Sequence, residues 1–494
     1  MKALLLYPKY PPTFWSFKYA LPFIGKKAAF PPLGLLTVAA MLPSSWKKKV
    51  VDMNITRLKD KDIEWADFVF ISAMIVQKES VREIIEKCKR LKVKIVAGGP
   101  LFTTGYEEFN DQIDHFILNE AEITLPLFLA DLERGQPRHI YTSSEFPDIT
   151  KTPAPIWELI NFKPYSALSI QYSRGCPFNC EFCDIVIMNG RVPRAKSKEQ
   201  IMKELDILYN RGWRSNVFFV DDNFIGNKER LKREILPSLI QWMKERSYPF
   251  SFNTEVSINL SDDEELMKLM SEAGFNTVFI GIETPDEKGL KECGKFQNTN
   301  RNLLNSIKKI QNYGIQVQAG FIVGFDSDTP SIFEKQINFI QRSGIVTAMV
   351  GILGALPKTR LYKRLKEEGR LLKHTSGDNT DYSINFVPKM GTNFLINGYK
   401  RILTTIYSPK NYYERVKIFL KNYRPPKREK WRLNLPDLEA FIKSIWFIGI
   451  TGKERIFYWR LFFRSLFTRP QLFPLAITLS IYGFHFRKVS ENYL

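Results

Sequence analysis

The feature that most restricts the fold of this 494-residue sequence is an alternation of short apolar runs with segments of helical periodicity. Strands that alternate with helices favour a parallel sheet with helices on both faces. One expected helix, QKESVREIIEKCKRL, places Val81, Ile84, Ile85 and Cys88 on one face. The expected strands of residues 1–142 are KALLLY, VVDMNI, DFVFISAM, VKIVAGG and HFILNE, and FPPLGLLTVAAML is a further expected helix. We therefore predict an open α/β domain in this part of the chain.

A second series of the same kind follows a proline-rich stretch. Residues 143–164 contain four prolines, which disfavour regular structure, and we assign them as a linker. Beyond it, six strand-type runs alternate with helical segments such as KEQIMKELDILYNRG and DDEELMKLMSEAG. Six β/α units predict a partial (βα)6 barrel of the TIM type over residues 165–374, with functional groups in the loops at the C-terminal edge of the strands. The expected strands are LSIQYS, VFFVD, FSFNTE, TVFIGIE, QVQAGFIVG and VTAMVGIL.

The positive charge of the chain is concentrated at its C-terminal end. Residues 400–494 contain 19 Lys and Arg against 6 Asp and Glu, so they carry +13 of the formal net charge of +20. Strand signals fade after about Leu371, and we expect residues 375–494 to form a mostly helical domain that is basic and aromatic. Such a region can face nucleic acid, anionic lipid or solvent. The first apolar run stops at Pro8, too early for a signal peptide, and five cysteines cannot form a disulfide framework, so a cytoplasmic protein is expected.

Three of the five cysteines lie within eight residues of each other. Cys176, Cys180 and Cys183 have C-x3-C-x2-C spacing, which brings three thiolates to one side of a tight loop. Three thiolates on a four-iron cubane leave one iron open for a reacting ligand. A structural zinc site is the alternative, but it normally needs four Cys or His ligands, and this region of the sequence has no histidine. We predict a 4Fe-4S cluster here and assign Cys88 and Cys293, which occur in helix-like contexts, to packing.

At these cysteines the chain resembles the radical S-adenosylmethionine (SAM) superfamily. That superfamily has an aromatic residue before the third cysteine, and Phe182 fills this position. The resemblance implies that the open iron binds the amino and carboxylate groups of SAM, while Phe182 packs near the adenine. It also implies that an electron from the cluster cleaves SAM to a 5′-deoxyadenosyl radical. A low-potential donor such as a flavodoxin or ferredoxin is the expected source of that electron.

Polar residues and glycines at other strand ends are candidates for contacts to SAM. Asp221, Asp222 and Asn223 follow the second barrel strand, where they can accept hydrogen bonds from the ammonium group of SAM or simply cap the next helix. Glu255 and Glu283 end the third and fourth strands, where carboxylates can hold ribose hydroxyls or bond to backbone donors. Two glycines of the segment GFIVGF allow the backbone to approach adenine closely, namely Gly320 and Gly324.

The layout of the whole chain resembles radical SAM enzymes that carry a cobalamin-binding domain ahead of the barrel, and within them the branch of hopanoid C-2 methylase and related lipid methylases. The segments that carry this resemblance are YPKYPPTFWSF, FPPLGLLTVAAMLP, ISAMIVQ, AGGP, SRGCPFNCEFCDI, VDDNFIGNK, GIETP and GFIVGFD. The resemblance implies a Rossmann-like cobalamin-binding domain over residues 1–142, with cobalamin in a groove at the C-terminal edge of its sheet. From the residues alone, such a domain can equally bind a nucleotide or nothing. The candidate contacts are Ser72, Ala73, Gly98, Gly99, Pro100, Asn119 and Glu120.

One departure from many cobalamin proteins concerns the lower face of cobalt. The Asp-x-His-x-x-Gly motif that supplies an axial histidine is missing, and His115, in DHFILNE, does not fit it. We therefore assign His115 to structure and expect no axial histidine from that motif.

The resemblance implies methylation of an unactivated carbon, with methylcobalamin as the methyl donor. The segment FIKSIWFIGITGKERIFYWRLFFRSLF interleaves aromatic, aliphatic and basic residues, which is typical of a helix at an anionic lipid surface. A packed helical subdomain with a solvated basic face fits it equally well. The uncharged stretch 471–486 is too short for a membrane span and is interrupted by Pro474. We predict an isoprenoid-type, hopanoid-like membrane lipid as substrate, with peripheral contact to the membrane.

Two other functions remain open at this point. One is a different radical SAM reaction, such as ring formation or rearrangement, on a soluble metabolite or peptide. The other is RNA modification, because basic and aromatic residues together also suit RNA. Radical SAM enzymes that insert sulfur into transfer RNA carry three further cysteines in their N-terminal domain, whereas this chain has only Cys88 there. No nucleic-acid partner is expected.

Overall fold

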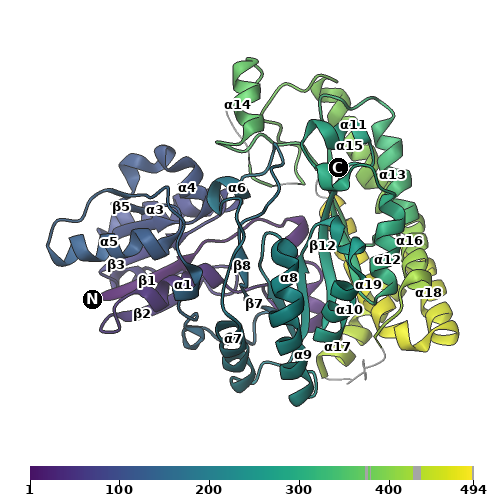
Figure 1. Ribbon diagram of the computed structural model, residues 1–494, viewed down its shortest axis with the longest axis horizontal. Helices are drawn as coiled ribbons and strands as arrows, with labels where there is room; N and C mark the ends of the chain where they lie inside the picture. The colour runs from purple at the N-terminus through teal and green to yellow at the C-terminus, as the bar shows by residue number, and fades with distance from the viewer. Residues whose placement is uncertain (373–375, 379, 427–434, 492–494) are drawn as a thin grey trace.

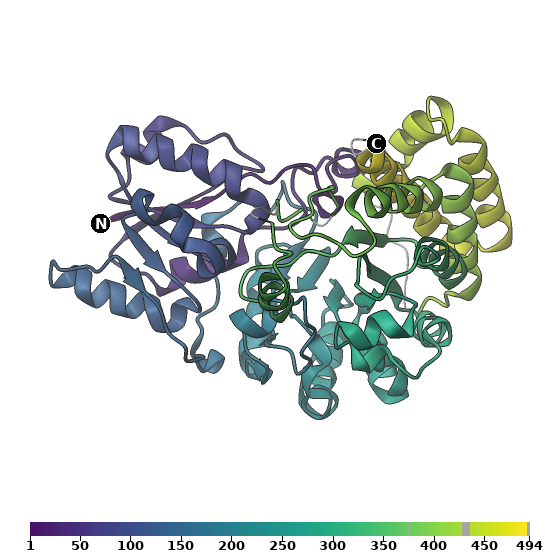
Figure 2. The same ribbon diagram turned by 90° about the horizontal axis from the view of Figure 1, so that it is seen from above.

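The chain folds into three parts that follow one another along its long axis (Figure 1, Figure 2). The computed structural model describes residues 1–372, 376–378, 380–426 and 435–491. An α/β domain lies at one end, a partial barrel in the middle and a group of helices at the other end. The predicted boundary between residues 374 and 375 lies outside the described residues.

The N-terminal domain is built on a parallel sheet of six strands in the order β2-β1-β3-β4-β5-β6, as the sequence predicts for this fold class. One buried cluster packs α3 against one face of the sheet, and another packs α1 and α5 against the other face. The strands are β1 (Lys2–Tyr7), β2 (Lys47–Asp52), β3 (Phe68–Ser72), β4 (Lys94–Gly98), β5 (His115–Ile117) and β6 (Ile140–Tyr141). The helices are α1 (Leu33–Met41), α2 (Asp60–Glu64), α3 (Lys78–Leu91), α4 (Pro100–Gly105) and α5 (Ala121–Glu133).

The second strand differs from its prediction. It begins at Lys47 and ends at Asp52, whereas the apolar pattern predicts residues 50–55. The lysines at 47–49 pair with Lys2–Leu4 of β1 along the edge of the sheet. Edge strands tolerate lysine and use it against edge-to-edge association, so hydrophobicity alone places the start too late.

The barrel is a second parallel sheet, in the order β14-β13-β12-β11-β10-β7, which confirms the predicted series of six units. Its strands are β7 (Leu168–Ile170), β10 (Asn216–Phe219), β11 (Ser251–Glu255), β12 (Phe275–Glu283), β13 (Gln316–Val323) and β14 (Ala348–Ile352). Its helices are α6 (Ile185–Met188), α7 (Lys198–Asn210), α8 (Lys228–Arg230), α9 (Leu236–Glu245), α10 (Glu264–Ala273), α11 (Glu287–Glu292), α12 (Leu303–Asn312), α13 (Ile332–Ser343) and α14 (Arg360–Glu367). The run LSIQYS, predicted as one strand, instead contains β7 and the start of a small antiparallel pair, β8 (Ser173–Arg174) with β9 (Arg194–Ala195).

The C-terminal helices pack on the outside of the barrel and on each other. The buried guanidinium of Arg415 donates to the carbonyl oxygens of Ile406 and Val346, so it joins the helices to the barrel at the start of its last strand. Within the described ranges, no helix is long and apolar enough to cross a membrane. The helices are α15 (Thr392–Ile406), α16 (Pro409–Asn422), α17 (Leu435–Ser444), α18 (Arg455–Thr468) and α19 (Phe473–Glu491), with a π-helical turn at Ile445–Ile450.

A long connection between β1 and α1 leaves the N-terminal domain and closes the open side of the barrel. Figure 2 shows this purple segment reaching the C-terminal helices. Trp15 packs edge-on against Phe279 of β12 at 5.4 Å, and its indole nitrogen lies 2.9 Å from the sulfur of Met349 on β14. Farther along, Ala28 forms a bridge with Tyr165, just before β7. The segment therefore spans the gap between the two outermost strands of the barrel sheet.

Candidate functional site

The three cysteines lie on the loop between β8 and α6, at the C-terminal end of the first barrel strand. Gly175 opens this loop with φ +95°, and a Cβ atom there would lie 2.9 Å from the carbonyl oxygen of Asn189. Only glycine adopts this conformation in so narrow a space without strain. Cys180 is buried, while Cys176 and Cys183 are partly accessible.

Two carboxylates after β10 hold the backbone on the N-terminal side of the cysteines. Asp221 accepts hydrogen bonds from the backbone nitrogens of Tyr172 and Ser173 and from the Ser173 hydroxyl. Burial raises the pKa of Asp221 to about 7, although these hydrogen bonds lower it. Asp222 accepts from the backbone nitrogen of Gly175 at 3.0 Å. Asp221 therefore holds the chain just before the cysteine loop. Its contact to the ammonium group of SAM stays a prediction.

Asn223, the third predicted residue after β10, supports the backbone just after β11. The side-chain oxygen of Asn223 accepts a hydrogen bond from the backbone nitrogen of Ser257 at 3.1 Å. Neither this residue nor the two carboxylates caps the following helix through its side chain, since Asn223 occupies the N-cap position without a side-chain cap bond. The loop after β10 thus ties the cysteine loop to the end of β11.

A buried cation lies beside the cysteines. The ammonium group of Lys295 is 2.7 Å from a carboxylate oxygen of Glu283, and both side chains are nearly inaccessible. Burial raises the pKa of the Cys176 thiol and raises that of Cys183 further, while the charge of Lys295 lowers both. Glu283 has φ +63°, and the register of β12 against β13 shifts at this residue. A strained backbone and a bulge at one strand end re-aim the side chain, so Glu283 points to Lys295.

The donor set fits an iron–sulfur cluster better than a single metal ion. Three thiols on one loop beside a lysine become good ligands once a metal removes their protons. Throughout the described residues, no group of three or more Cys, His, Asp and Glu side chains is close enough to hold one ion. A cubane has a different requirement, because each thiolate binds its own iron.

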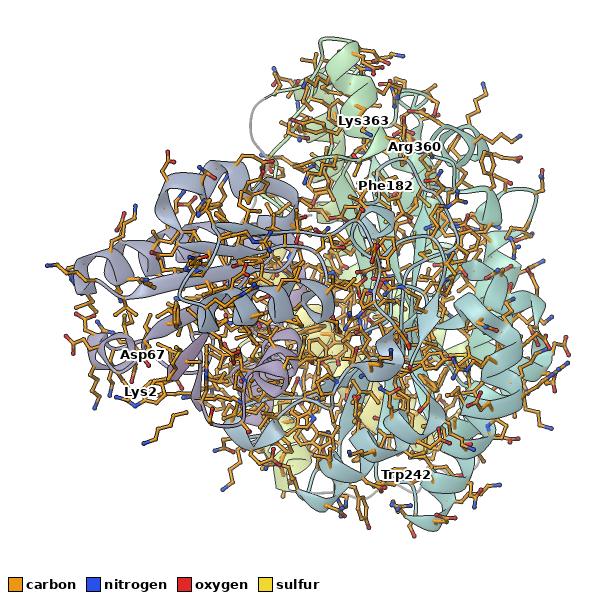
Figure 3. All side chains as sticks on the ribbon, turned by 60° about the vertical axis from the view of Figure 1, so that its left-hand side comes forward. Lys2, Asp67, Phe182, Trp242, Arg360 and Lys363 are labelled. Carbon is orange, nitrogen blue, oxygen red and sulfur yellow. The ribbon has the colours of Figure 1, made fainter. Side chains whose placement is uncertain are left out.

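The aromatic residue before the third cysteine contacts the loop after β13. The ring of Phe182 packs against that of Phe325, with centroids 6.4 Å apart. Figure 3 shows Phe182 at the same end of the barrel as Arg360 and Lys363 of α14. Next to Phe325, Gly324 has φ +107°, and a Cβ atom there would lie 2.9 Å from Leu395 of α15. Gly320 faces Phe279, which a Cβ atom would approach to 3.0 Å. The predicted adenine residues Phe182 and Gly324 thus lie in neighbouring loops.

A large cavity extends from this end of the barrel towards the C-terminal helices. Its volume is about 1180 Å³, and its lining includes Glu255 at the end of β11 and Met74 beyond the end of β3. Burial and the charge of Asp222 raise the pKa of Glu255 to about 8, so this carboxyl group is mostly protonated at neutral pH. Most of the wall is apolar and is supplied by Phe218, Phe279, Met349, Trp15, Phe23, Phe441, Phe473 and Ile477.

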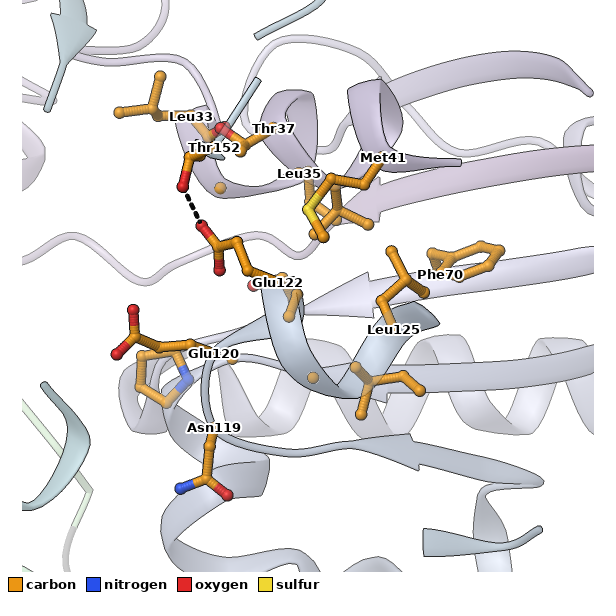
Figure 4. A pocket seen from close by; sticks show the side chains of 18 of the residues that line it. Leu33, Leu35, Thr37, Met41, Phe70, Asn119, Glu120, Glu122, Leu125 and Thr152 are labelled. Carbon is orange, nitrogen blue, oxygen red and sulfur yellow. Dashed lines mark hydrogen bonds between the residues drawn. The ribbon is translucent and has the colours of Figure 1, made fainter. Parts of the chain in front are cut away.

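A second, smaller cavity of about 340 Å³ lies beyond the C-terminal ends of β3, β4 and β5. Figure 4 shows lining side chains of this cavity from α1, among them Leu33 and Thr37, and from the start of α5, among them Glu122 and Leu125. Gly99 has φ +86°, and a Cβ atom there would lie 2.5 Å from the Ser72 hydroxyl. A Cβ atom on Gly98 would lie 2.7 Å from the carbonyl oxygen of Ile117. This edge requires glycine, as expected of a groove that admits the tail of cobalamin. The predicted residues that line it are Ser72, Gly98, Gly99, Pro100, Asn119 and Glu120, while Ala73 is buried directly behind it.

Buried ion pairs join this cavity to the cysteine loop. Arg174, two residues before Cys176, lies 2.5 Å from Glu120 and 2.8 Å from Glu122 at the start of α5. Arg194 of β9 binds the other oxygen of Glu120 at 2.6 Å. We call these four charged side chains the interdomain ion-pair cluster. The sequence does not predict these ion pairs, because nothing in it relates Glu120 to an arginine 54 positions away.

The remaining histidine and cysteines lie where a structural role explains them. His115 is the first residue of β5, at the end of the strand away from the cavity, and one ring nitrogen is 2.7 Å from the carbonyl oxygen of Arg138. Cys88 is buried on α3. Cys293 is buried directly behind the cysteine loop, where its carbonyl oxygen accepts a hydrogen bond from Glu181. Its proximity to the loop was not apparent from the sequence.

Three family models match separate parts of the chain. Residues 27–129 match the B12 binding domain and residues 170–340 the Radical SAM superfamily. Residues 359–494 match a domain of unknown function.

Individual relatives agree with this division. The chain is 43% identical to an uncharacterized methyltransferase of Synechocystis, sll1242, over 99% of this chain and 92% of that protein. It is 34% identical to the hopanoid C-2 methylase of Rhodopseudomonas palustris, over 94% of this chain and 89% of that protein. Among solved structures, the cobalamin-dependent SAM radical enzyme OxsB, with aqua-cobalamin and SAM bound, superimposes with a TM-score of 0.64 at 16% identity, over 100% of this chain and 79% of that one. At that identity the likeness to OxsB concerns the fold.

Proposed function

This chain belongs to the cobalamin-dependent radical SAM methyltransferases, and from that premise we propose that it methylates an unactivated carbon of an isoprenoid-type, hopanoid-like membrane lipid. Its cofactors are a 4Fe-4S cluster, SAM and cobalamin. Together they supply the radical and the methyl group, and the protein positions the substrate and excludes water. In this proposal Cys176, Cys180 and Cys183 hold the cluster, and the edge formed by Gly98 and Gly99 receives cobalamin.

The cavity of about 1180 Å³ is the observation that carries the substrate proposal. Pockets for drug-sized ligands have volumes of about 300–1,000 Å³, so this space suits a larger molecule. Its lining comes from all three parts of the chain, with Met74 from the N-terminal domain, Glu255 from the barrel and Leu466 from the C-terminal helices. A substrate that occupied it would contact every part of the enzyme at once.

The chemistry of the cavity wall supports an uncharged and mostly apolar occupant. Aromatic and aliphatic side chains dominate, and the polar groups near the cofactor end, Asn253 and Glu255, lie two residues apart on one strand. The side-chain oxygen of Asn253 has no hydrogen-bond partner among the described residues, and Glu255 is mostly protonated at neutral pH. Other polar residues, among them Asn216, Gln318 and Asp437, also line the cavity, but most of its wall is apolar. A mostly apolar cavity binds a polycyclic hydrocarbon with one small polar group better than a nucleotide or a charged peptide.

Two partners complete the proposal. An apolar lipid resides in a bilayer, so we propose that the enzyme contacts the membrane peripherally through its C-terminal region. Reductive cleavage of SAM consumes an electron, and we propose a low-potential protein donor of the flavodoxin or ferredoxin type.

Lipid mass spectrometry of a deletion strain tests the substrate. We expect loss of a lipid that is one methyl group heavier than a remaining precursor. The purified holoenzyme, with SAM and a reductant under anaerobic conditions, should add that methyl group to a hopanoid in detergent. A deletion strain with unchanged lipids, together with no product from any hopanoid, would contradict a lipid substrate.

A further inference from the structure

The last helices expose an unusual number of large apolar side chains. Ile442, Trp446, Ile450, Ile456, Phe463 and Phe467 are each between 49% and 77% exposed. They lie on α17, the π-helical turn and α18, and Figure 1 shows α18 at the edge of the molecule away from the N-terminal domain. Monomeric proteins rarely leave so many large apolar side chains of one short segment in water, and such surfaces usually contact a partner or a membrane. We call this patch the C-terminal apolar surface.

Basic residues accompany this surface. Lys453, Arg455, Arg460 and Arg464 are exposed, and within the described part of the chain none of them forms an ion pair. Residues 435–472 contain six Lys and Arg against three Asp and Glu. Apolar side chains interleaved with unpaired cations match the interface of an anionic bilayer, where cations meet lipid headgroups and rings reach the acyl chains.

The large cavity reaches the same surface. Leu438 on α17 and Leu466 on α18 line the cavity and are themselves 51% and 37% exposed. Behind them, Phe441 and Phe473 line the cavity and pack against each other, with ring centroids 6.0 Å apart. The two exposed leucines, with Asp437 beside them, therefore mark one mouth of the cavity, and Met74, which is 43% exposed, lines it at the N-terminal domain. We refer below to the mouth at the leucines, from which the cavity leads past aromatic rings into the interior.

We propose that the C-terminal apolar surface docks on an anionic bilayer and holds the mouth of the cavity against the acyl chains, so that a lipid enters the enzyme without crossing water. This proposal rests on the proposed function for the identity of the lipid, but not for the docking. The occupant of the surface is the bilayer, and a protein partner or a second copy of the chain is an outcome of the test.

Vesicle flotation of the holoenzyme tests the docking. The wild type should float with vesicles of phosphatidylglycerol and phosphatidylcholine. The variant I456S/F463S/F467S should stay at the bottom, whereas L127S, a matched change at an exposed leucine of α5, should float like the wild type. Because each basic residue near anionic lipid contributes about 1 kcal/mol, R455Q/R460Q/R464Q should bind these vesicles roughly 100-fold more weakly. Cleavage of SAM in the absence of lipid should be retained in every variant, which checks that they fold.

Tryptophan quenching by lipids with brominated acyl chains tests the position of the mouth. W446F should remove a quenched component of the emission, whereas W242F, a change in barrel helix α9, should not. Adding L438W or L466W to W446F should restore quenching, because both positions would face the acyl chains.

Several results would overturn the proposal. They are a wild type that ignores the vesicles, a serine variant that floats normally, an introduced tryptophan at the mouth that is not quenched, or a dimer in solution that the serine variant breaks. Flotation and quenching without methylation of any hopanoid would leave the docking intact and contradict only the proposed substrate.

Discussion

Replacement of Arg174 by Met should release the N-terminal domain from the cysteine loop. The side chains of Glu120, Glu122 and Arg174 are only 7%, 12% and 14% exposed, so removal of the Arg174 cation leaves the Glu122 carboxylate without a paired cation in a poorly solvated place. Breaking such a buried pair costs about 3–5 kcal/mol, and we expect the lower end, about 3 kcal/mol, because Arg194 still binds Glu120. For a domain of 150–250 residues that unfolds cooperatively, a loss of about 3 kcal/mol corresponds to a fall in Tm of roughly 6–12 °C.

The effect should depend on pH in a direction set by Glu122. Burial pushes the pKa of Glu122 up, but the hydrogen bond and charge of Arg174 bring it below the ordinary value. A carboxyl group whose pKa is lowered in the folded state stabilises the fold at pH values above its ordinary pKa. This stabilisation is lost as the pH falls through the lowered pKa. Without Arg174, burial dominates, the pKa of Glu122 rises, and its ionisation at neutral pH opposes folding. The difference in Tm between wild type and variant should therefore be largest near neutral pH and shrink towards about pH 4.5.

Differential scanning calorimetry of the two proteins at several pH values checks this reasoning. Arg82→Met is the matched control, because Arg82 is 47% exposed and pairs with Glu79 and Glu108 at the surface. Exposed pairs contribute about 0–1 kcal/mol, so the control should lose only a few degrees. Equal losses in the two variants, or a loss at Arg174 that does not change with pH, would refute a buried interdomain role.

Three further predictions concern the cofactors. Alanine at Cys176, Cys180 or Cys183 should abolish iron binding after anaerobic reconstitution, whereas C88A and C293A should keep about four irons per chain, as in a 4Fe-4S cluster; iron loss in either of the last two would reveal an unrecognised ligand. H115A should leave the absorption spectrum of bound cobalamin unchanged, because His115 lies at the far end of β5, and a spectral shift typical of lost nitrogen ligation would contradict this placement. G99A, whose Cβ atom would meet the Ser72 hydroxyl at 2.5 Å, should weaken cobalamin retention in an equilibrium binding assay by at least about tenfold, equivalent to 1.4 kcal/mol, while G105A, which has open space, should retain cobalamin normally.

Local sequence patterns determined the architecture and the centre of the chemistry. The alternation of strands and helices specifies two parallel sheets, because each buried strand and each amphipathic helix has its own periodicity. The spacing of Cys176, Cys180 and Cys183 specifies a compact set of thiolates, since all three lie on one loop and need no distant partner. Gly99 follows the same logic, because the positive φ of a tight strand-to-helix turn is a local requirement.

Contacts between residues far apart in the sequence were decided only by the tertiary structure. Asp221 looks like a cofactor ligand beside a strand end, and the fold sets its carboxylate against Ser173 of β8, which lies 48 positions earlier and just before the cysteine loop. Glu120 looks like a groove residue, and the fold pairs it with Arg174 of β8 and Arg194 of β9. Such partners depend on how the domains meet, and side-chain identity at one position does not encode the position of the other.

The large cavity, like these contacts, could not be predicted from the sequence. Its wall joins Trp15, Phe279 and Ile477, which lie in the connection after β1, the barrel and the last helix. Each residue in its own segment resembles ordinary core, because apolar periodicity reports that a side chain is buried and not whether it meets protein or a hollow. The sequence by itself therefore determined the set of cluster thiolates and, through its resemblance to a known family, indicated SAM and cobalamin. The space that admits a substrate arose only when the three parts packed together, because a cavity is a property of the gap between surfaces and not of any one segment.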